Sequence, residues 1–138
     1  MIGDKRKFNI ALVTLKAKGA TGILPGGDEL DAEAAALVDG VKTISDAKKS
    51  KQYTDIILQA IKDVNEDGSV VTKRAAKIQK FAILNHDVSV ETDELTATYK
   101  LKRGFMHGKY EKVIEQIYES ADSYVEVDSF SNPTKRGR

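Results

Sequence analysis

The chain has 138 residues, a length that fits one domain with a single core and is short for an enzyme with several separate substrate sites. Its 22 basic and 21 acidic side chains give a net charge of +1, which argues against nucleic acid or an anionic membrane surface as a bulk electrostatic partner and leaves small anions as candidate ligands. The absence of cysteine excludes disulfides and a thiolate nucleophile, and without a signal-peptide core or an apolar run of about 18 residues we expect a soluble, cytoplasmic chain.

The chain begins with a predicted β-hairpin. Gly3 and Asp4 are typical turn residues, and residues 8–15 have the apolar character of the strand that would follow them. Three basic residues at the turn have two interpretations: a solvated hairpin tip next to a sheet edge, or a set of contacts to phosphate groups. These residues are Lys5, Arg6 and Lys7.

The next segment is predicted to be a loop followed by a short helix. Residues 16–31 contain five glycine or proline residues, which are typical of a loop. Asp31 can cap a helix over residues 32–38, and Gly40 would end that helix. We assign no chemistry to this segment.

The strongest helix signal covers residues 53–64, where apolar side chains recur at the spacing of one helix face and must therefore pack on a core. Ser45 is predicted to cap a short helical piece before it. The apolar run over residues 81–84 predicts a buried central strand. His86 follows in a polar turn, and we expect it at the surface because neither metal-ligand spacing nor a nucleophile accompanies it.

A segment rich in threonine and lysine comes next. Polar and less polar side chains alternate over residues 96–101, as in a half-buried strand, and this parity places Lys100 and Lys102 on the same face. Such a strand would hold two ammonium groups on a rigid scaffold. Residues 105–118 show the apolar spacing of a helix, so strand and helix can pack together and fix the direction of the lysines.

These elements predict an α+β fold in which a small mixed β-sheet is flanked by helices. We assign residues 1–120 to this domain. Residues 121–138 differ in character and are predicted to be a C-terminal tail with a frayed basic end. Within this tail, residues 124–128 either form a strand or lie along the surface.

Three sequence blocks follow one another in order along the chain. They are Gly3-Asp4-Lys5-Arg6-Lys7-Phe8, then Ile78-Gln79-Lys80-Phe81-Ala82-Ile83-Leu84, and then Glu94 to Arg103 with Lys109-Tyr110. In content and order the blocks resemble the C-terminal domain of long-chain fatty acyl-CoA synthetases of the bubblegum type, which belong to the adenylate-forming superfamily. The resemblance covers residues 1–120 and is loose over residues 16–31.

The third block departs from the family pattern at three positions. Asp93 stands where the family usually has glycine, Ala97 where it has proline, and Tyr99 where it has leucine. In the wider superfamily a glycine precedes the catalytic lysine, and Tyr99 stands there instead, so the register leaves two candidate lysines. Lys100 is preferred because it takes the place of the first lysine in the motif Thr-x-Lys-Leu-Lys-Arg, and Lys102 is the alternative.

The resemblance implies an ATP-dependent, AMP-forming ligase. A fatty acid attacks the α-phosphate of ATP to give an acyl-adenylate and pyrophosphate, and coenzyme A then displaces AMP. The chain would be the C-terminal lobe of this enzyme, with Lys100 as the catalytic lysine and the basic turn residues contacting phosphates of coenzyme A. The partner in cis would be an N-terminal adenylation domain with its hinge, which would also supply the ligands of Mg²⁺, so the lone chain is expected to be inactive.

A second interpretation rests on the residues without the resemblance. Exposed lysines on a strand usually serve solubility, and the chain would then be a non-enzymatic α+β binding or regulatory module. A longer reading frame upstream, carrying a phosphate loop rich in serine, threonine and glycine, would favour the ligase. A complete native chain starting at Met1 would favour the module.

Overall fold

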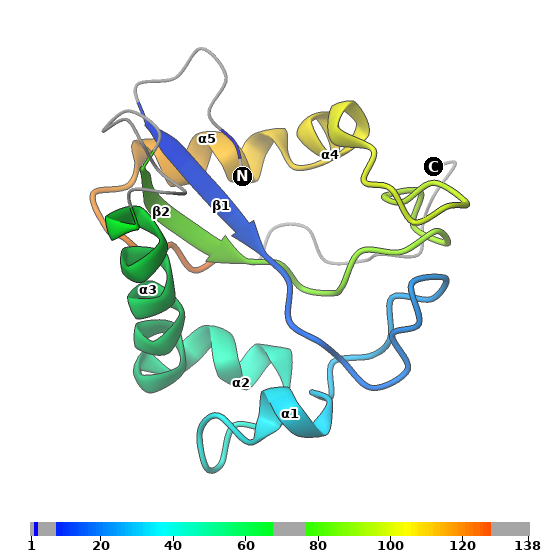
Figure 1. Ribbon diagram of the computed structural model, residues 1–138, viewed down its shortest axis with the longest axis horizontal. Coiled ribbons are helices and arrows are strands. Elements are labelled where there is room, and N and C mark those ends of the chain that lie inside the picture. Colours follow the sequence, from blue (N-terminus) through cyan, green and yellow to red (C-terminus); the bar gives the residue numbers. More distant parts are fainter. Residues whose placement is uncertain (1, 3–7, 68–76, 128–138) are drawn as a thin grey trace.

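Two parallel strands form the centre of the structure, a computed structural model that describes residue 2, residues 8–67 and residues 77–127. Strand β1 (Asn9–Val13) pairs with strand β2 (Ile78–Ile83), and three helices lie between them in the sequence (Figure 1). Strand β1 lies within the predicted segment 8–15, and β2 overlaps the predicted segment 81–84 but begins earlier, at Ile78. Because the strands are parallel, their C-terminal ends lie side by side, and the chain leaves both strands at this end of the sheet.

Isolated bridges continue the pairing on both sides of these strands. Ile2 pairs antiparallel with Ile10, and its N–H donates to the Ile10 carbonyl over 2.8 Å, as expected for the predicted N-terminal hairpin. On the other side, Tyr124 pairs in parallel with Phe81. The predicted α+β class is therefore confirmed, and the described part of the predicted segment 124–128 contributes a single bridge at Tyr124 rather than a full strand.

Side chains that alternate along the strands enter two separate apolar clusters, one on each face of the sheet. Helix α5 (Glu111–Glu119) covers the first face, on which Ile10 and Ala82 lie. Helices α2 (Ile44–Lys49) and α3 (Lys51–Glu66) cover the second face, on which Phe81 and Ile83 lie. The fold is thus a small sheet between helical layers, as the apolar periodicity requires.

The helices of the first half begin at identifiable capping residues. Helix α1 (Ala32–Ala35) starts at Asp31, whose side chain accepts from the Ala32 N–H, so this predicted cap is confirmed, although the helix is shorter than residues 32–38. Helix α3 starts at Ser50 and contains the predicted residues 53–64. The prediction that Ser45 caps the helix before it is wrong. Thr43 caps α2, because its hydroxyl accepts from the Asp46 N–H.

The predicted continuous helix over residues 105–118 is wrong. It is divided into α4 (Arg103–Lys109) and α5, with Tyr110 between them at φ −105° and ψ 20°. Two glycines in α4 weaken the helix before the break. The Tyr110 side chain is fully buried, and its hydroxyl bonds to Glu94 in another part of the chain, so tertiary contacts hold this junction in its bent form.

The C-terminal part of the described chain packs into the first apolar cluster. Val125 and Val127 are both buried there, and the Val125 N–H donates to the Phe81 carbonyl over 3.0 Å. Residues 128–138 lie outside the described residues, so the division between a lobe and a tail stays a prediction.

Candidate functional site

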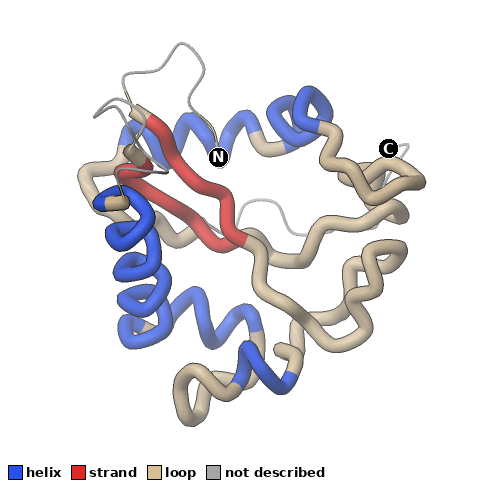
Figure 2. Tube along the Cα trace, viewed as in Figure 1, coloured by secondary structure: helices blue, strands red, loops and turns tan. Residues whose placement is uncertain are grey.

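The loops that follow β1 and β2 gather at the edge of the sheet where both strands end (Figure 2). Residues 84–102 follow β2, and they include both lysines of the predicted motif. The predicted strand over residues 96–101 is wrong. Its residues form a tight hairpin loop that is closed by an isolated antiparallel bridge between Leu95 and Leu101. We call residues 94–102 the lysine hairpin.

Hydrogen bonds within the lysine hairpin explain why it turns so sharply. The Thr96 N–H donates to the Lys100 carbonyl and the Tyr99 N–H donates to the Thr96 carbonyl, both over 2.8 Å. Tyr99 has φ 65°, in the left-handed region. A short loop whose last residue is left-handed is a common three-residue hairpin connection, and glycine usually holds that position. Tyrosine there costs about 1–2 kcal/mol in backbone strain.

The two candidate lysines differ in their surroundings. Lys100 is exposed at the end of the loop, and its ammonium forms no ion pair with the described residues. Lys102 is about half-exposed, and its Nζ lies 3.9 Å from Asp93 Oδ1. Such an exposed pair contributes little to stability and leaves the ammonium accessible. The basic turn residues predicted to contact coenzyme A, 5–7, lie outside the described residues.

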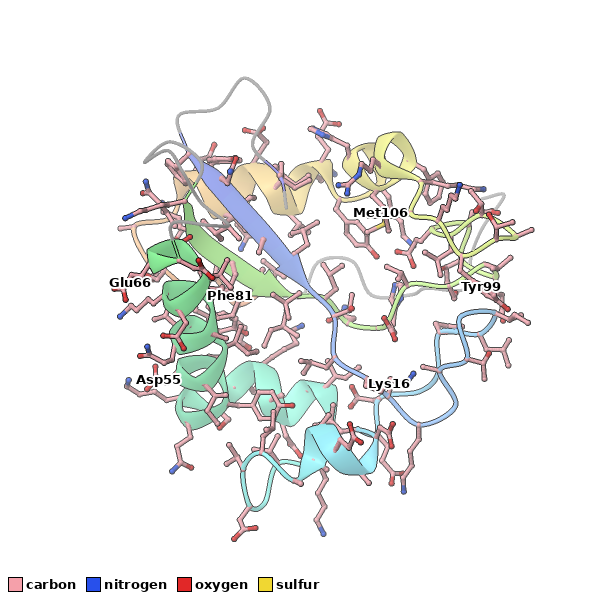
Figure 3. The ribbon with its side chains drawn as sticks, viewed as in Figure 1. Lys16, Asp55, Glu66, Phe81, Tyr99 and Met106 are labelled. Atoms are coloured by element: carbon pink, nitrogen blue, oxygen red, sulfur yellow. The ribbon has the colours of Figure 1, made fainter. Side chains whose placement is uncertain are left out.

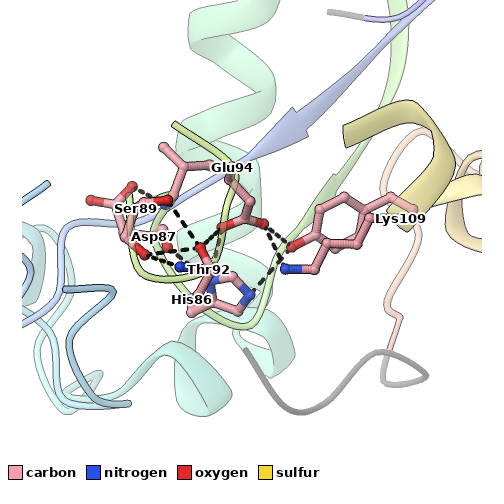
Figure 4. Close-up of polar contacts among 8 residues, drawn as sticks. His86, Asp87, Ser89, Thr92, Glu94 and Lys109 are labelled. Carbon is pink, nitrogen blue, oxygen red and sulfur yellow. Dashed lines mark hydrogen bonds and ion pairs between the residues drawn. The ribbon is translucent and has the colours of Figure 1, made fainter. Parts of the chain in front are cut away.

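The base of the lysine hairpin is fixed by a buried carboxylate, which the sequence analysis did not single out. Glu94 is fully buried. Its Oε1 accepts from the Thr92 hydroxyl over 2.5 Å, and its Oε2 accepts from the Tyr110 hydroxyl over 2.5 Å and from Lys109 Nζ over 3.1 Å (Figure 4). The presence of Lys109-Tyr110 in the third motif block was the available signal, because a buried carboxylate requires donors.

His86 belongs to the same buried cluster, so the prediction of a surface histidine is wrong. Its side chain lies between Asp87, Glu94 and Tyr110. Nδ1 is 2.8 Å from the Asp87 carbonyl oxygen and 3.6 Å from Glu94 Oε1, and Nε2 is 3.2 Å from the Tyr110 hydroxyl. Because a carbonyl cannot donate, the Nδ1 atom carries a proton. The residues around His86 that look like an exposed polar turn in the sequence therefore belong to a buried polar cluster in the fold.

Ser89 connects this cluster to the main chain of the hairpin. Its hydroxyl lies 2.8 Å from the Thr92 hydroxyl and accepts from the Thr92 N–H over 3.2 Å. Its carbonyl accepts from the Glu94 N–H over 3.1 Å. Among the described residues no buried side-chain nitrogen or oxygen lacks a hydrogen-bond partner, so the polar interior is fully satisfied and rigid.

The loop after β1 contacts the lysine hairpin from a second direction. The Val90 N–H donates to the Gly22 carbonyl over 2.8 Å. The side chain of Tyr99, labelled in Figure 3, lies against Gly22, where an added Cβ would be 3.0 Å from the ring. Gly22 has φ 85°, a conformation that favours glycine. A loop to which we assigned no chemistry thus packs against the segment that carries the lysines.

Burial raises the pKa of the Tyr110 hydroxyl far above its ordinary value, and the adjacent Glu94 carboxylate raises it further. The hydroxyl is therefore a permanent donor in the cluster. Tyr110→Phe is expected to reduce the alkaline sensitivity of folding. Because the folded-state pKa is raised, the stabilisation by this group is fully present below about pH 10 and is lost above it by about 1.4 kcal/mol per pH unit.

Urea unfolding between about pH 9 and about pH 11 tests this expectation. Above about pH 10, the free energy of unfolding of the unsubstituted chain should fall more steeply than that of the variant. Groups other than Tyr110 titrate in both proteins and cancel in the comparison. Equal slopes would contradict the assignment of a raised pKa to this hydroxyl.

The described part of the chain contains no group of three or more His, Cys, Asp or Glu side chains that could hold a metal ion. In that same part of the chain, every helix is too short or too polar to span a bilayer.

Comparison with known proteins shows the relatives of this chain. Long-chain-fatty-acid–CoA ligase heimdall of Drosophila melanogaster is 31% identical, over 86% of this chain and 21% of the relative. Long-chain-fatty-acid–CoA ligase ACSBG2 of Gallus gallus is 35% identical, over 89% and 16% respectively. The human long-chain-fatty-acid–CoA ligase ACSBG1 is 34% identical, over 86% of this chain and 17% of the relative. No protein-family model and no solved structure matches the chain.

These relatives define the class: the chain is a homologue of one region of the long-chain-fatty-acid–CoA ligases. Within this class it belongs to the bubblegum-type family, and the resemblance expected from the three sequence blocks is confirmed. The chain spans only about a fifth of the length of these relatives.

Proposed function

We propose that the chain is the C-terminal catalytic lobe of an ATP-dependent, AMP-forming long-chain fatty acid–CoA ligase and that Lys100 is its adenylation lysine. The observation that carries the proposal is the backbone of the hairpin. Asp93 and Tyr99 are the two non-glycine residues with positive φ in the described chain, at 64° and 65°. Asp93 stands where the family has glycine, and Tyr99 stands where the wider superfamily has glycine. The left-handed backbone conformation that glycine favours is therefore retained at both positions without glycine.

This backbone also favours one register of the motif over the other. In the superfamily pattern the glycine immediately precedes the catalytic lysine. Tyr99 holds the left-handed conformation typical of glycine, and Lys100 follows it directly. Residue 101, which precedes Lys102, is not in the left-handed region. The geometry therefore supports Lys100 as the adenylation lysine and leaves Lys102 as the alternative.

The exposed position of Lys100 suits the chemistry of the first half-reaction. When a fatty acid carboxylate attacks the α-phosphate of ATP, negative charge concentrates around that phosphate. A lysine ammonium is a compact charge on a flexible stem, and it can bridge the phosphate and the carboxylate when another domain presents them. Lys100 is exposed on the surface of its own lobe, so it would stabilise that charge across an interface.

The remaining parts of the proposal concern the parent protein. ATP, the fatty acid and coenzyme A are its substrates, and an N-terminal adenylation domain provides the enclosed nucleotide pocket and the ligands of Mg²⁺. The lobe rotates between half-reactions and presents another face for thioester formation. Lys5, Arg6 and Lys7 contact the phosphates of coenzyme A.

Domain transplantation tests the proposal. The isolated chain should release no fatty acid-dependent pyrophosphate, because a lone lobe offers lysines and no enclosed pocket. A hybrid in which this chain replaces the corresponding segment of a bubblegum-type ligase should release it, and the same hybrid with Lys100→Ala is the control. Pyrophosphate release by the isolated chain, or a folded hybrid no more active than the ligase without that segment, would overturn the proposal.

A further inference from the structure

We propose that Glu94 is a positioning residue for the lysine hairpin: its buried carboxylate clamps the base of the hairpin to the junction of α4 and α5 and thereby fixes where Lys100 is presented. The structural part of this inference stands on the contacts alone. Its catalytic consequence rests on the function proposed above.

Glu94 is the one acidic side chain that is fully buried in the described part of the chain. Removing a carboxylate from water costs several kcal/mol unless donors compensate for the lost hydration. Three donors reach it, from Thr92, Tyr110 and Lys109, and Lys109 brings a positive charge whose side chain is itself 23% exposed. Charge-assisted hydrogen bonds of this kind are shorter and stronger than those between neutral groups.

The donors come from different elements, so the carboxylate joins parts of the chain that are distant in sequence. Lys109 is the last residue of α4, and Tyr110 forms the break before α5. Thr92 and His86 belong to the loop after β2. The break at Tyr110 has a role in this arrangement, because it places a tyrosine hydroxyl and a lysine ammonium on the same carboxylate oxygen.

The same residue also holds the hairpin through its main chain. The Glu94 carbonyl accepts from the Lys102 N–H over 2.9 Å, which is the outermost bond that closes the hairpin. The next pair inward is the bridge between Leu95 and Leu101. A rotation of the Glu94 backbone would therefore move both arms of the hairpin together. The side chain prevents this rotation because its two oxygens are bonded in different directions.

Glu94→Gln tests whether Glu94 acts through its charge and hydrogen bonds or only by filling space. Glutamine has nearly the same shape, but its amide nitrogen cannot accept a hydrogen bond, and the neutral side chain no longer balances Lys109. One donor of the cluster therefore loses its acceptor, and the clamp loosens while the apolar core is unchanged. A matched control is Ile117→Val, a fully buried apolar change in α5 at a residue that makes none of the hydrogen bonds to Glu94.

The first measurement is amide hydrogen exchange on the 138-residue chain. Relative to the Leu84 amide, which bonds Val13 across the sheet, the Lys102 amide should exchange at least about tenfold faster in Glu94→Gln. In Ile117→Val the exchange rates of the two amides should increase by the same factor. Parallel acceleration in both variants would overturn the proposal, because Glu94 would then support the fold as a whole.

The second measurement uses the transplanted hybrid and follows the two half-reactions separately. Glu94→Gln should lower the adenylation rate at saturating ATP and fatty acid by about tenfold to a hundredfold, the size expected for a misplaced catalytic group. Thioester formation from supplied acyl-adenylate should change by less than about threefold. A merely structural defect would lower both rates together, and this result would also overturn the proposal.

These measurements also separate this proposal from the proposed function. Selective loosening of the hairpin with no effect of either Glu94→Gln or Lys100→Ala on adenylation would support the clamp and overturn the role of the lysine. Selective loosening with intact adenylation, in a hybrid that Lys100→Ala inactivates, would overturn the positioning role of Glu94 in catalysis.

Discussion

Replacing Lys100 by Ala in a hybrid ligase is expected to lower fatty acid-dependent adenylation by about a hundredfold to a thousandfold, the usual loss for one preorganised electrostatic contact at a reacting group. Thioester formation from supplied acyl-adenylate should stay within about tenfold, because that step uses another face of the lobe. Pyrophosphate release and thioester formation, measured separately, provide the test. The substitution should leave folding unchanged, because the side chain is exposed.

Two lysines serve as controls for this result. Lys112→Ala removes an exposed charge from α5 and should leave both half-reactions unchanged. Lys102→Ala removes the ammonium that lies 3.9 Å from Asp93 and should have a smaller effect than Lys100→Ala. If Lys102→Ala abolished adenylation and Lys100→Ala did not, the motif would be displaced by two residues. If neither mattered, the role assigned to the hairpin would be wrong.

Phe81→Ala is expected to lower the free energy of unfolding by about 3–5 kcal/mol, as for other fully buried aromatic residues. The ring is fully buried and packs against Tyr124, with ring centroids 5.0 Å apart. Its removal leaves a cavity on the second face of the sheet and loosens the aromatic contact to the C-terminal segment.

Urea unfolding followed by circular dichroism measures this loss. Leu37→Ala is a suitable control, because it also shortens a large apolar side chain, but one that is 52% exposed, and it should cost about 0.5 kcal/mol or less. Equal losses in the two variants would show that Phe81 is not a principal core residue.

The elements that the sequence predicted correctly are those with a long periodic signal. Residues 53–64 form part of α3, because the spacing of their apolar side chains is compatible with one structure only, a helix with one face packed on a core. The strands around Ile10 and Phe81 were predicted because a short apolar run between polar turns must be buried. Ser45 and Thr43 show the limit of such reasoning, because either residue could cap α2 and only the packed chain selects Thr43.

The lysine hairpin shows why the site itself was harder to predict. Its residues alternate as in a strand, and it lacks the glycine, asparagine or proline that marks a tight turn. The turn is evident only in the structure, from the positive φ of Tyr99, the hydrogen bonds that close the loop and the packing against Gly22. The partners of Glu94 were equally hidden, because hydrogen bonds between residues 86, 94 and 110 depend on tertiary structure and leave no periodic pattern.

The parallel pairing of β1 with β2 has a consequence for how the chain reaches this structure. The two strands are neighbours in the sheet, but all of α1, α2 and α3 lies between them in the sequence. The entropy of closing that long loop opposes the pairing before any contact between the strands can stabilise it, so non-local pairing of this kind folds slowly. On the ribosome, the apolar faces of β1 have no partner strand until Ile83 has emerged, and this interval is when the nascent chain is most exposed to aggregation.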